Sequence, residues 1–238
     1  MMAASQALLR ALGCVALCAF TSCRPAFEQR LAGLVLAVDG SGEATRAGTT
    51  GRLTTGARVE PGTKIRAQGE ARVDLMLVPG ILVELSGAGE IEIRQLHLAR
   101  NGDETIHPMR AREASVRLPR GLLLATIGQT QTRSHLSVET AAGRLVAGSG
   151  RTFLIEVTGQ KTRVMSVRGR VAFKPAGGGA STKVDAGFFA EWPGDAAPRS
   201  AADAGPEAQA DVSRIITVKR RLLRLEKEER SAFLPWQR

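Results

Sequence analysis

Short runs in which apolar and polar residues alternate, separated by glycines, dominate the chain from Gly33 to Trp192. Successive side chains of a strand point to opposite faces, so this period of two predicts strands with one buried and one wetter face. The glycines recur at strand-length intervals and mark turns. The alternating runs are 72–77, 81–85, 90–94, 116–118, 136–138, 153–157 and 171–173. We therefore expect an all-β domain over 31–192, either a sandwich or a rolled, solenoid-like stack of short strands.

Two stretches of this region differ from the rest. Residues 97–114 lack alternation, which predicts a long surface loop between two β halves. The stretch from Val184 to Trp192 is apolar enough to form a last strand.

The C-terminal part has another composition. Residues 193–205 are rich in Ala, Pro and Gly, as in a flexible linker. Pro206 suits the first turn of a helix, where its missing N–H is not needed, and Pro235 limits the far end. This predicts one amphipathic helix over 206–234 with a basic polar side. Its apolar stripe consists of Val212, Ile215, Val218, Leu222 and Leu225.

Three roles for this helix remain open. Its stripe can pack on the β domain, it can lie on an anionic membrane surface, or it can bind a partner or a second copy of itself. The candidate residues for contact with a partner or surface are Arg220, Arg221, Leu222, Arg224 and Leu225.

The N-terminal segment resembles an export signal. An apolar run from Ala11 to Phe20 is too short to span a bilayer as a helix but suits a signal peptide. The sequence Phe-Thr-Ser-Cys at 20–23 resembles a bacterial lipobox, with Phe20 where Leu is usual. We expect residues 1–22 to be a lipoprotein signal peptide and Cys23 to carry lipid; an ordinary signal peptide cut nearby is the alternative. Arg24, in place of an Asp, favours the outer membrane, facing the periplasm.

Composition restricts the chemistry of the mature chain. All three cysteines lie within the first 23 residues, so neither a disulfide framework nor a cysteine metal site is expected. The formal charge of +10 and the pI of about 10.7 would suggest nucleic acid in a cytosolic protein. With no Tyr and only two Trp, however, the chain offers few stacking platforms for bases. For an exported chain, the expected polyanions are anionic lipids and cell-wall polymers.

The ionisable residues show no catalytic pattern. The histidines, His97, His107 and His135, have no metal-binding spacing and are expected to be solvated. Glu90 and Glu92 share a strand face and resemble paired carboxylates. Their alternation with isoleucine instead indicates the wet face of a half-buried strand. No catalytic, cofactor or metal site is predicted, and the chain is not expected to be an enzyme.

Two groups of glycine-led motifs occur in a characteristic order. The first comprises 56–59, 61–65, 71–77, Gly80 and 81–85; the second comprises 118–121, 138–143, 150–155 and 167–171. Together they resemble a FecR-type domain over about 33–190, although Arg151 separates Gly150 from Thr152 where the family has Gly-Thr-x-Phe. The transmembrane helix and cytoplasmic segment of the iron-dicitrate regulator that names the family have no counterpart here. The resemblance therefore implies the periplasmic binding module.

The resulting expectation is a non-catalytic envelope lipoprotein whose FecR-like β domain binds another envelope protein in signal sensing or regulation. The alternative is a protein that binds or hydrolyses cell-wall carbohydrate. A hydrolase would show a deep pocket with converging carboxylates, around Glu84, Glu90 or Glu92.

Overall fold

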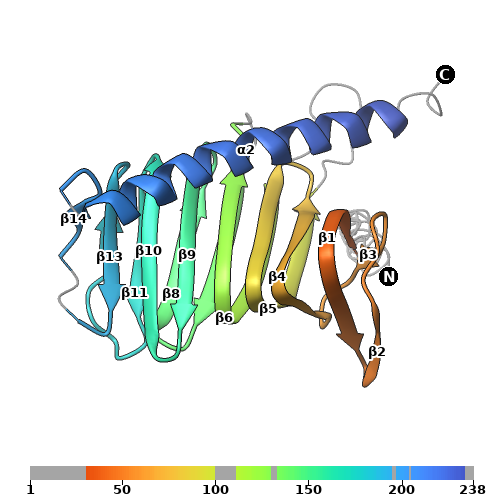
Figure 1. Cartoon of the computed structure of the whole chain (residues 1–238), viewed down its shortest axis with the longest axis horizontal. Coiled ribbons are helices and arrows are strands. Elements are labelled where there is room, and N and C mark those ends of the chain that lie inside the picture. The colour runs from red at the N-terminus through yellow and green to blue at the C-terminus, as the bar shows by residue number, and fades with distance from the viewer. Residues whose placement is uncertain (1–30, 100–110, 130–132, 195–196, 204, 234–238) are drawn as a thin grey trace, which may run out of the picture.

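The computed structural model describes residues 31–99, 111–129, 133–194, 197–203 and 205–233 (Figure 1). In this part of the chain a 14-stranded, mostly antiparallel sheet precedes helix α2, Pro206–Phe233. The strands are β1 Gly33–Arg46, β2 Thr49–Arg52, β3 Arg58–Val59, β4 Lys64–Val78, β5 Ile81–Ala99, β6 Ala111–Ile127, β7 Arg133–Thr140, β8 Gly143–Gly148, β9 Thr152–Thr158, β10 Lys161–Arg168, β11 Val171–Pro175, β12 Thr182–Val184, β13 Phe188–Trp192 and β14 Arg199–Ser200. The prediction of an all-β domain followed by one C-terminal helix is confirmed.

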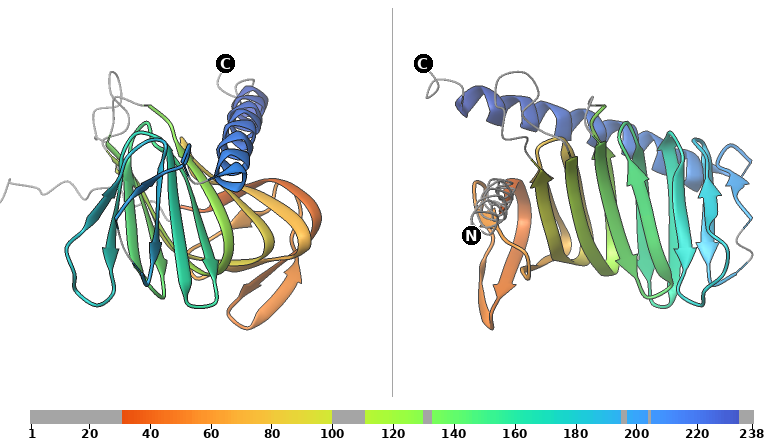
Figure 2. Two further views of the ribbon diagram at one scale, coloured as in Figure 1. Left: turned by 60° about the vertical axis from the view of Figure 1, so that its left-hand side comes forward. Right: turned by 180° about the vertical axis from the view of Figure 1, so that it is seen from behind.

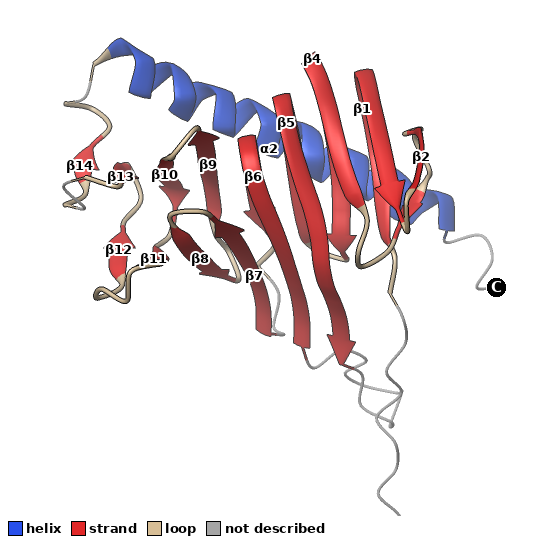
Figure 3. Ribbon diagram, turned by 90° about the horizontal axis from the view of Figure 1, so that it is seen from below, coloured by secondary structure: helices blue, strands red, loops and turns tan. Residues whose placement is uncertain are grey.

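The sheet bends into two layers, and three long strands take part in both of them. β4, β5 and β6 have 15, 19 and 17 residues. The first part of β6 pairs in parallel with β7, while its last part pairs antiparallel with β9. The strand order therefore divides along β6 into a β9–β10–β13 branch and a β7–β8–β11–β12 branch. Figure 3 shows the first branch next to α2 and the second farther from it. The result is a sandwich whose layers share their longest strands.

The space between the layers holds the main apolar core. Alternate residues of both layers point inward and are fully buried, as Val83, Leu123 and Ile155 are in one layer and Val138 is in the other. The rings of Phe173 on β11 and Trp192 on β13 stack with centroids 4.0 Å apart. The apolar residues that recur at every second position therefore form the inner face of each layer, where they are removed from water.

The bend between the layers depends on close contact between two backbones. Gly121 in β6 has a φ of 96°, a conformation that side chains other than glycine rarely adopt. A Cβ at this residue would lie 2.3 Å from the Cα of Gly89 in β5. The pairing of β5 with β6 shifts register between Ser86 and Glu90, at the same place. Glycine at both positions lets the two strands turn together.

Two segments differ from their sequence-based description. Residues 97–99 and 111–114 were expected in a loop but belong to β5 and β6, which stay paired out to Ala99 and Ala111. Backbone pairing and the burial of Leu98 and Ala114 extend these strands beyond the region of clear alternation; residues 100–110 lie outside the described residues. In the proposed linker, β14 pairs with β13 and Ala201 is buried. Among the described helices, none has the length and apolarity needed to cross a membrane.

Replacing Gly121 with Ala is expected to destabilise the sandwich by forcing β5 and β6 apart. The added methyl group creates both backbone strain and the clash with Gly89. Gly62→Ala is the matched control, because Gly62 has a φ of 88° but open space around its Cβ position. We expect Gly121→Ala to lower the free energy of unfolding by about 1–3 kcal/mol more than Gly62→Ala, measured by urea denaturation. Equal losses would show that the close approach does not matter.

Candidate functional site

Helix α2 lies across the outer face of the layer that contains β9, β10 and β13 (Figures 1 and 2). Its Ile215, Val218 and Leu222 are buried there. The residues of the sheet that they meet point away from the main core and form a second apolar cluster with the helix. We call this surface the covered face; its buried apolar residues are Leu36, Leu82, Leu124, Leu154, Met165 and Phe189. Of the three roles left open for the helix, the structure shows packing on its own domain.

The candidate contact residues of α2 are divided between two sides of the helix. Leu222 is fully buried, Leu225 is partly buried against the covered face, and Arg221 reaches the sheet. Only Arg220 and Arg224 of the five are exposed. The apolar stripe is therefore occupied by the chain's own sheet, because leaving it wet would cost its burial free energy.

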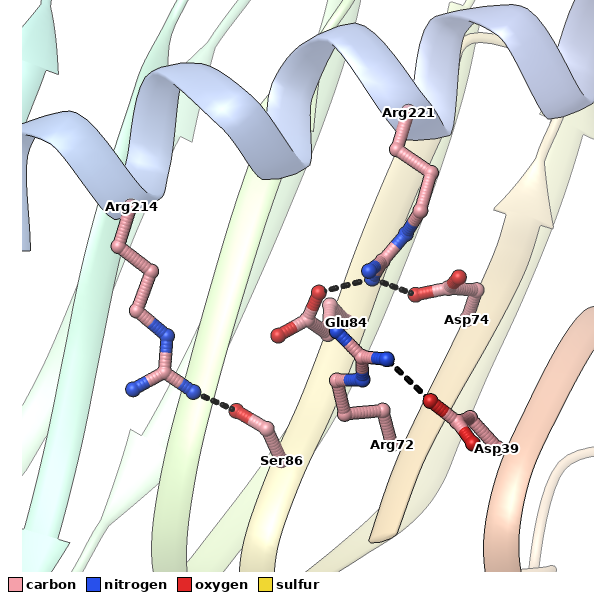
Figure 4. A network of polar contacts seen from close by, with 7 residues as sticks. All are labelled: Asp39, Arg72, Asp74, Glu84, Ser86, Arg214 and Arg221. Atoms are coloured by element: carbon pink, nitrogen blue, oxygen red, sulfur yellow. Dashed lines mark hydrogen bonds and ion pairs between the residues drawn. The ribbon is translucent and has the colours of Figure 1, made fainter. Parts of the chain in front are cut away.

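Arg221 joins two acidic side chains beneath the helix (Figure 4). Asp74 and Glu84 are direct cross-strand partners on β4 and β5. Arg221 Nη2 donates a hydrogen bond to Asp74 Oδ1 at 2.9 Å and another to Glu84 Oε2. The exposed fraction is 5% for the Asp74 side chain and 0% for that of Glu84. Like charges placed directly opposite each other destabilise a sheet, so the guanidinium compensates the repulsion that this register creates.

The charges of this cluster are not balanced. Two carboxylates share one guanidinium, and burial raises the pKa of Asp74 although Arg221 opposes the rise. The charge of Glu84 raises the pKa of Asp74 further. Within the described residues, Glu84 Oε1 and Arg221 Nε are buried without a hydrogen-bond partner. Because a buried charge is costly without its counter-ion, the covered face favours the one arrangement that brings Arg221 to it.

Further polar contacts hold α2 in register along its length. Near its start, Asp211 pairs with Arg163 of β10 at 3.0 Å. Arg214 donates a hydrogen bond to Ser86 Oγ at 3.1 Å (Figure 4). Toward the other end, Glu226 Oε1 accepts a hydrogen bond from the Gly80 backbone N–H at 3.0 Å. These contacts are spaced over four turns of the helix, so they specify its position along the sheet.

Two open depressions lie beside Arg214, with volumes of about 440 and 680 Å³. Both include Ser86, Gly87 and Arg214 in their walls. The first is also lined by Arg120 and Glu156, and the second by Asp39, Glu70 and Arg72. Arg72 and Asp39 pair with each other at its edge (Figure 4). The mixture of acids and bases does not form the converging carboxylates of a hydrolase.

The other acidic candidates are paired with arginines. Glu90 lies 2.9 Å from Arg66, and Glu92 lies 3.0 Å from Arg94. The exposed fractions of these carboxylate side chains are 18% and 14%, so the expected wet face is in fact partly buried. The neighbouring arginines cover the carboxylates, which explains the difference.

The histidines and possible metal ligands form no common site. His97 is partly buried on β5, and His135 is exposed on β7. His107 lies outside the described residues. Among the residues that the structure describes, no group of three or more His, Cys, Asp or Glu is placed to hold a metal ion.

Alternation within 72–77 and 81–85 predicts that Asp74 and Glu84 lie on the side away from the main core, but it does not indicate their pairing with Arg221. A signal was present in the continuous apolar runs 122–125 and 153–155. Such runs are typical of strands buried on both faces, which predicts an additional covering element. The partner of the two acids could not be identified from a pattern, because Glu84 and Arg221 lie 137 positions apart in the chain.

Comparison with known proteins yields only distant similarity. No family model matches the sequence, and no curated protein matches it. Two crystal structures, at 2.50 and 1.65 Å resolution, of a "putative anti-sigma factor" from Parabacteroides distasonis ATCC 8503 are similar in structure, with 11% and 10% sequence identity. Each similarity has a TM-score of 0.42 and covers 58% of this chain and 59% of the other. At this level the similarity does not establish a shared function.

Adjacent leucines of α2 provide a matched test of helix packing. Leu222 is fully buried in the covered face, whereas Leu223 is 40% exposed. We expect Leu222→Ala to lower the free energy of unfolding by about 2–5 kcal/mol, because it leaves a cavity under the helix. Leu223→Ala should change it by less than about 0.5 kcal/mol. Urea denaturation of both variants measures the difference; equal effects would show that α2 does not pack on the sheet through Leu222.

The raised pKa of Asp74 predicts that stability depends on pH. Between the ordinary value of 3.8 and the raised pKa, the folded protein binds more protons at this carboxyl than the unfolded chain does. The contribution of Asp74 to the free energy of unfolding therefore falls as pH rises through that window. Asp74→Asn should remove this part of the dependence in urea denaturation across acidic to neutral pH.

Asp39 supplies the control for this measurement. The hydrogen bond from Arg72 lowers the pKa of Asp39, so its stabilising contribution is present above 3.8 and is lost as pH falls through the lowered pKa. Asp39→Asn should therefore alter only the acidic end of the profile, with the opposite sign. Parallel profiles of wild type and Asp74→Asn above pH 3.8 would contradict the assignment to Asp74.

Proposed function

We propose that this chain is a non-catalytic envelope lipoprotein whose FecR-like β domain binds another envelope protein, in signal sensing or regulation. The observation that carries the proposal is the asymmetry of the sandwich. Helix α2 covers one outer face, whereas the outer face of the β7–β8–β11–β12 branch has no helix packed on it among the described residues. A rigid sheet with one uncovered face is suited to binding.

The uncovered surface, which we call the open face, follows one row of paired residues across six strands. The row consists of Gln95, Ser115, Ser137, Val146, Ala172 and Lys183. Val146 is 42% exposed and borders a depression of about 180 Å³ together with Glu113, His135 and Arg144. An exposed apolar side chain among amide, hydroxyl and charged groups is typical of the surface at which two proteins meet.

The positions of the acidic residues do not favour the alternative function, hydrolysis of cell-wall carbohydrate. Glu84 and Asp74 are covered by α2 and bound by Arg221. Glu90 and Glu92 each pair with an arginine. A glycosidase needs two carboxylates that reach the same substrate bond from solvent.

The proposed location in the envelope is based on the N-terminal sequence. We propose that Cys23 carries lipid and holds the domain at the outer membrane, facing the periplasm; this residue lies outside the described part of the chain. The FecR resemblance supports the same compartment, because the family's module is periplasmic. The motifs that carry it form β3–β5 and the β6–β11 region of one continuous sandwich.

A photo-crosslinking residue at position 146 tests the proposal in cells. We expect irradiation to join the open face to one discrete envelope protein, giving an adduct in the membrane fraction. Combining this change with Cys23→Ala should release the protein from membranes and abolish labelling by a fatty-acid probe. It should also reduce the yield of the adduct at least about tenfold, because anchoring raises the concentration of the protein near its partner.

The same crosslinker at Thr50, an exposed residue of β2, is the matched control and should give no such adduct. Identical products from positions 50 and 146 would contradict the role of the open face. Unchanged fractionation and labelling of Cys23→Ala would instead reject the lipid anchor.

A further inference from the structure

The solvent side of α2 combines basic residues with two exposed apolar ones. Ile216 and Leu223 are 39% and 40% exposed and lie two turns apart on the same side of the helix. Arg220 and Arg224 are exposed beside them. We call these four residues the outer face of α2; they take no part in the second apolar cluster.

Two of the acidic side chains that the structure describes in α2 face the sheet. Asp211 pairs with Arg163 of the sheet, and Glu226 binds the backbone of Gly80. Glu228 is the acidic residue with an exposed side chain among those described in α2, and it lies 3.9 Å from Arg224. Packing on the sheet therefore leaves the outer face with an excess of positive charge.

The start of the β domain lies close to the C-terminal half of α2. Leu34 and Leu36 of β1 belong to the same apolar cluster as Leu222 and Leu225. Leu31 is eight positions after Cys23, and a chain of eight residues spans about 28 Å when fully extended. A lipid on Cys23 would thus hold Leu31, at the start of the β domain, within about 28 Å of the bilayer.

We propose that the outer face of α2 rests on the anionic phospholipid surface of the membrane to which Cys23 anchors the chain. Arg220 and Arg224 would contact headgroup phosphates, and Ile216 and Leu223 would enter the interfacial region, as in other amphipathic helices that lie on membranes. This inference rests on the lipid anchor in the proposed function. Figure 2 shows α2 as a ridge on the outside of the sandwich, which allows contact with a flat surface.

A lipid surface fits the outer face better than a protein partner does. Protein interfaces are enriched in aromatic residues, but none of the four residues of the outer face is aromatic, and its two apolar side chains stand singly on either side of Arg220. Diffuse positive charge with little apolar area instead matches a surface of many phosphates. Because the open face lies on the opposite layer, this orientation would turn Val146 away from the membrane and toward a partner.

Vesicle flotation tests the proposal without the lipid anchor. The protein is residues 23–238 with Cys23→Ser, which keeps every described strand and α2. We expect it to float with phosphatidylcholine vesicles that contain phosphatidylglycerol, to bind pure phosphatidylcholine far less, and to dissociate as salt is added. Arg220→Glu with Arg224→Glu should reduce binding at least about tenfold, and Ile216→Ser with Leu223→Ser should reduce it severalfold.

Arg52→Glu with Lys64→Glu is the control, since it makes the same change in net charge at exposed residues of β2 and β4, outside both α2 and the open face. Its binding should stay within about twofold of wild type. If both charge-reversed proteins lose vesicle binding equally, binding depends only on the net charge of the protein and the proposal is overturned. Absence of vesicle binding by the wild-type protein would also overturn it. A dimer in light scattering that Ile216→Ser with Leu223→Ser converts to a monomer would assign the surface to a second copy.

These outcomes are independent of the anchor. Fatty-acid labelling of the native protein at Cys23, combined with no vesicle binding, would reject the helix surface and leave the lipoprotein assignment in place. Vesicle binding without labelling would reject the anchor instead.

Discussion

Asp74 and Glu84 lie directly opposite each other on β4 and β5, and Arg221 relieves their repulsion by donating a hydrogen bond to each of them. The three side chains come from elements that are far apart in the sequence, so the cluster forms only when α2 is in place. Apolar packing would hold a helix on this layer in several positions, because it has little direction. The charged cluster, together with Glu226 at Gly80, selects one of them.

The position of α2 gives the outer surfaces of the sandwich different roles. The covered face is closed to solvent, so its acids are not accessible to a substrate. The open face leaves Val146 exposed beside Glu113, His135 and Arg144. The outer face of α2 is basic because Asp211 and Glu226 point inward. A single packing event therefore separates a buried, structural surface from the two exposed surfaces for which we propose binding.

The covered face also explains where prediction from sequence stops. Alternation around Val83, Leu123 and Ile155 correctly identified the inner side of the strands. The other side was interpreted as solvated, although Leu82, Leu124 and Leu154 are buried there. A period of two separates the faces of a strand but does not reveal whether a distant helix covers the second one. The same limit applies to Arg221, whose basic character gave no indication that it pairs with buried acids.

The sequence by itself determined the β class, the glycine-marked turns and the amphipathic C-terminal helix, because each depends on residues close together in the chain. Only the tertiary structure decided how β6 divides between two layers, which face α2 covers and which of its arginines remain in solvent. Those features depend on contacts between residues more than one hundred positions apart, such as Ser86 with Arg214 and Glu84 with Arg221. Local periodicity carries no information about such pairs, since strand order and helix position are set by the packing of the whole domain.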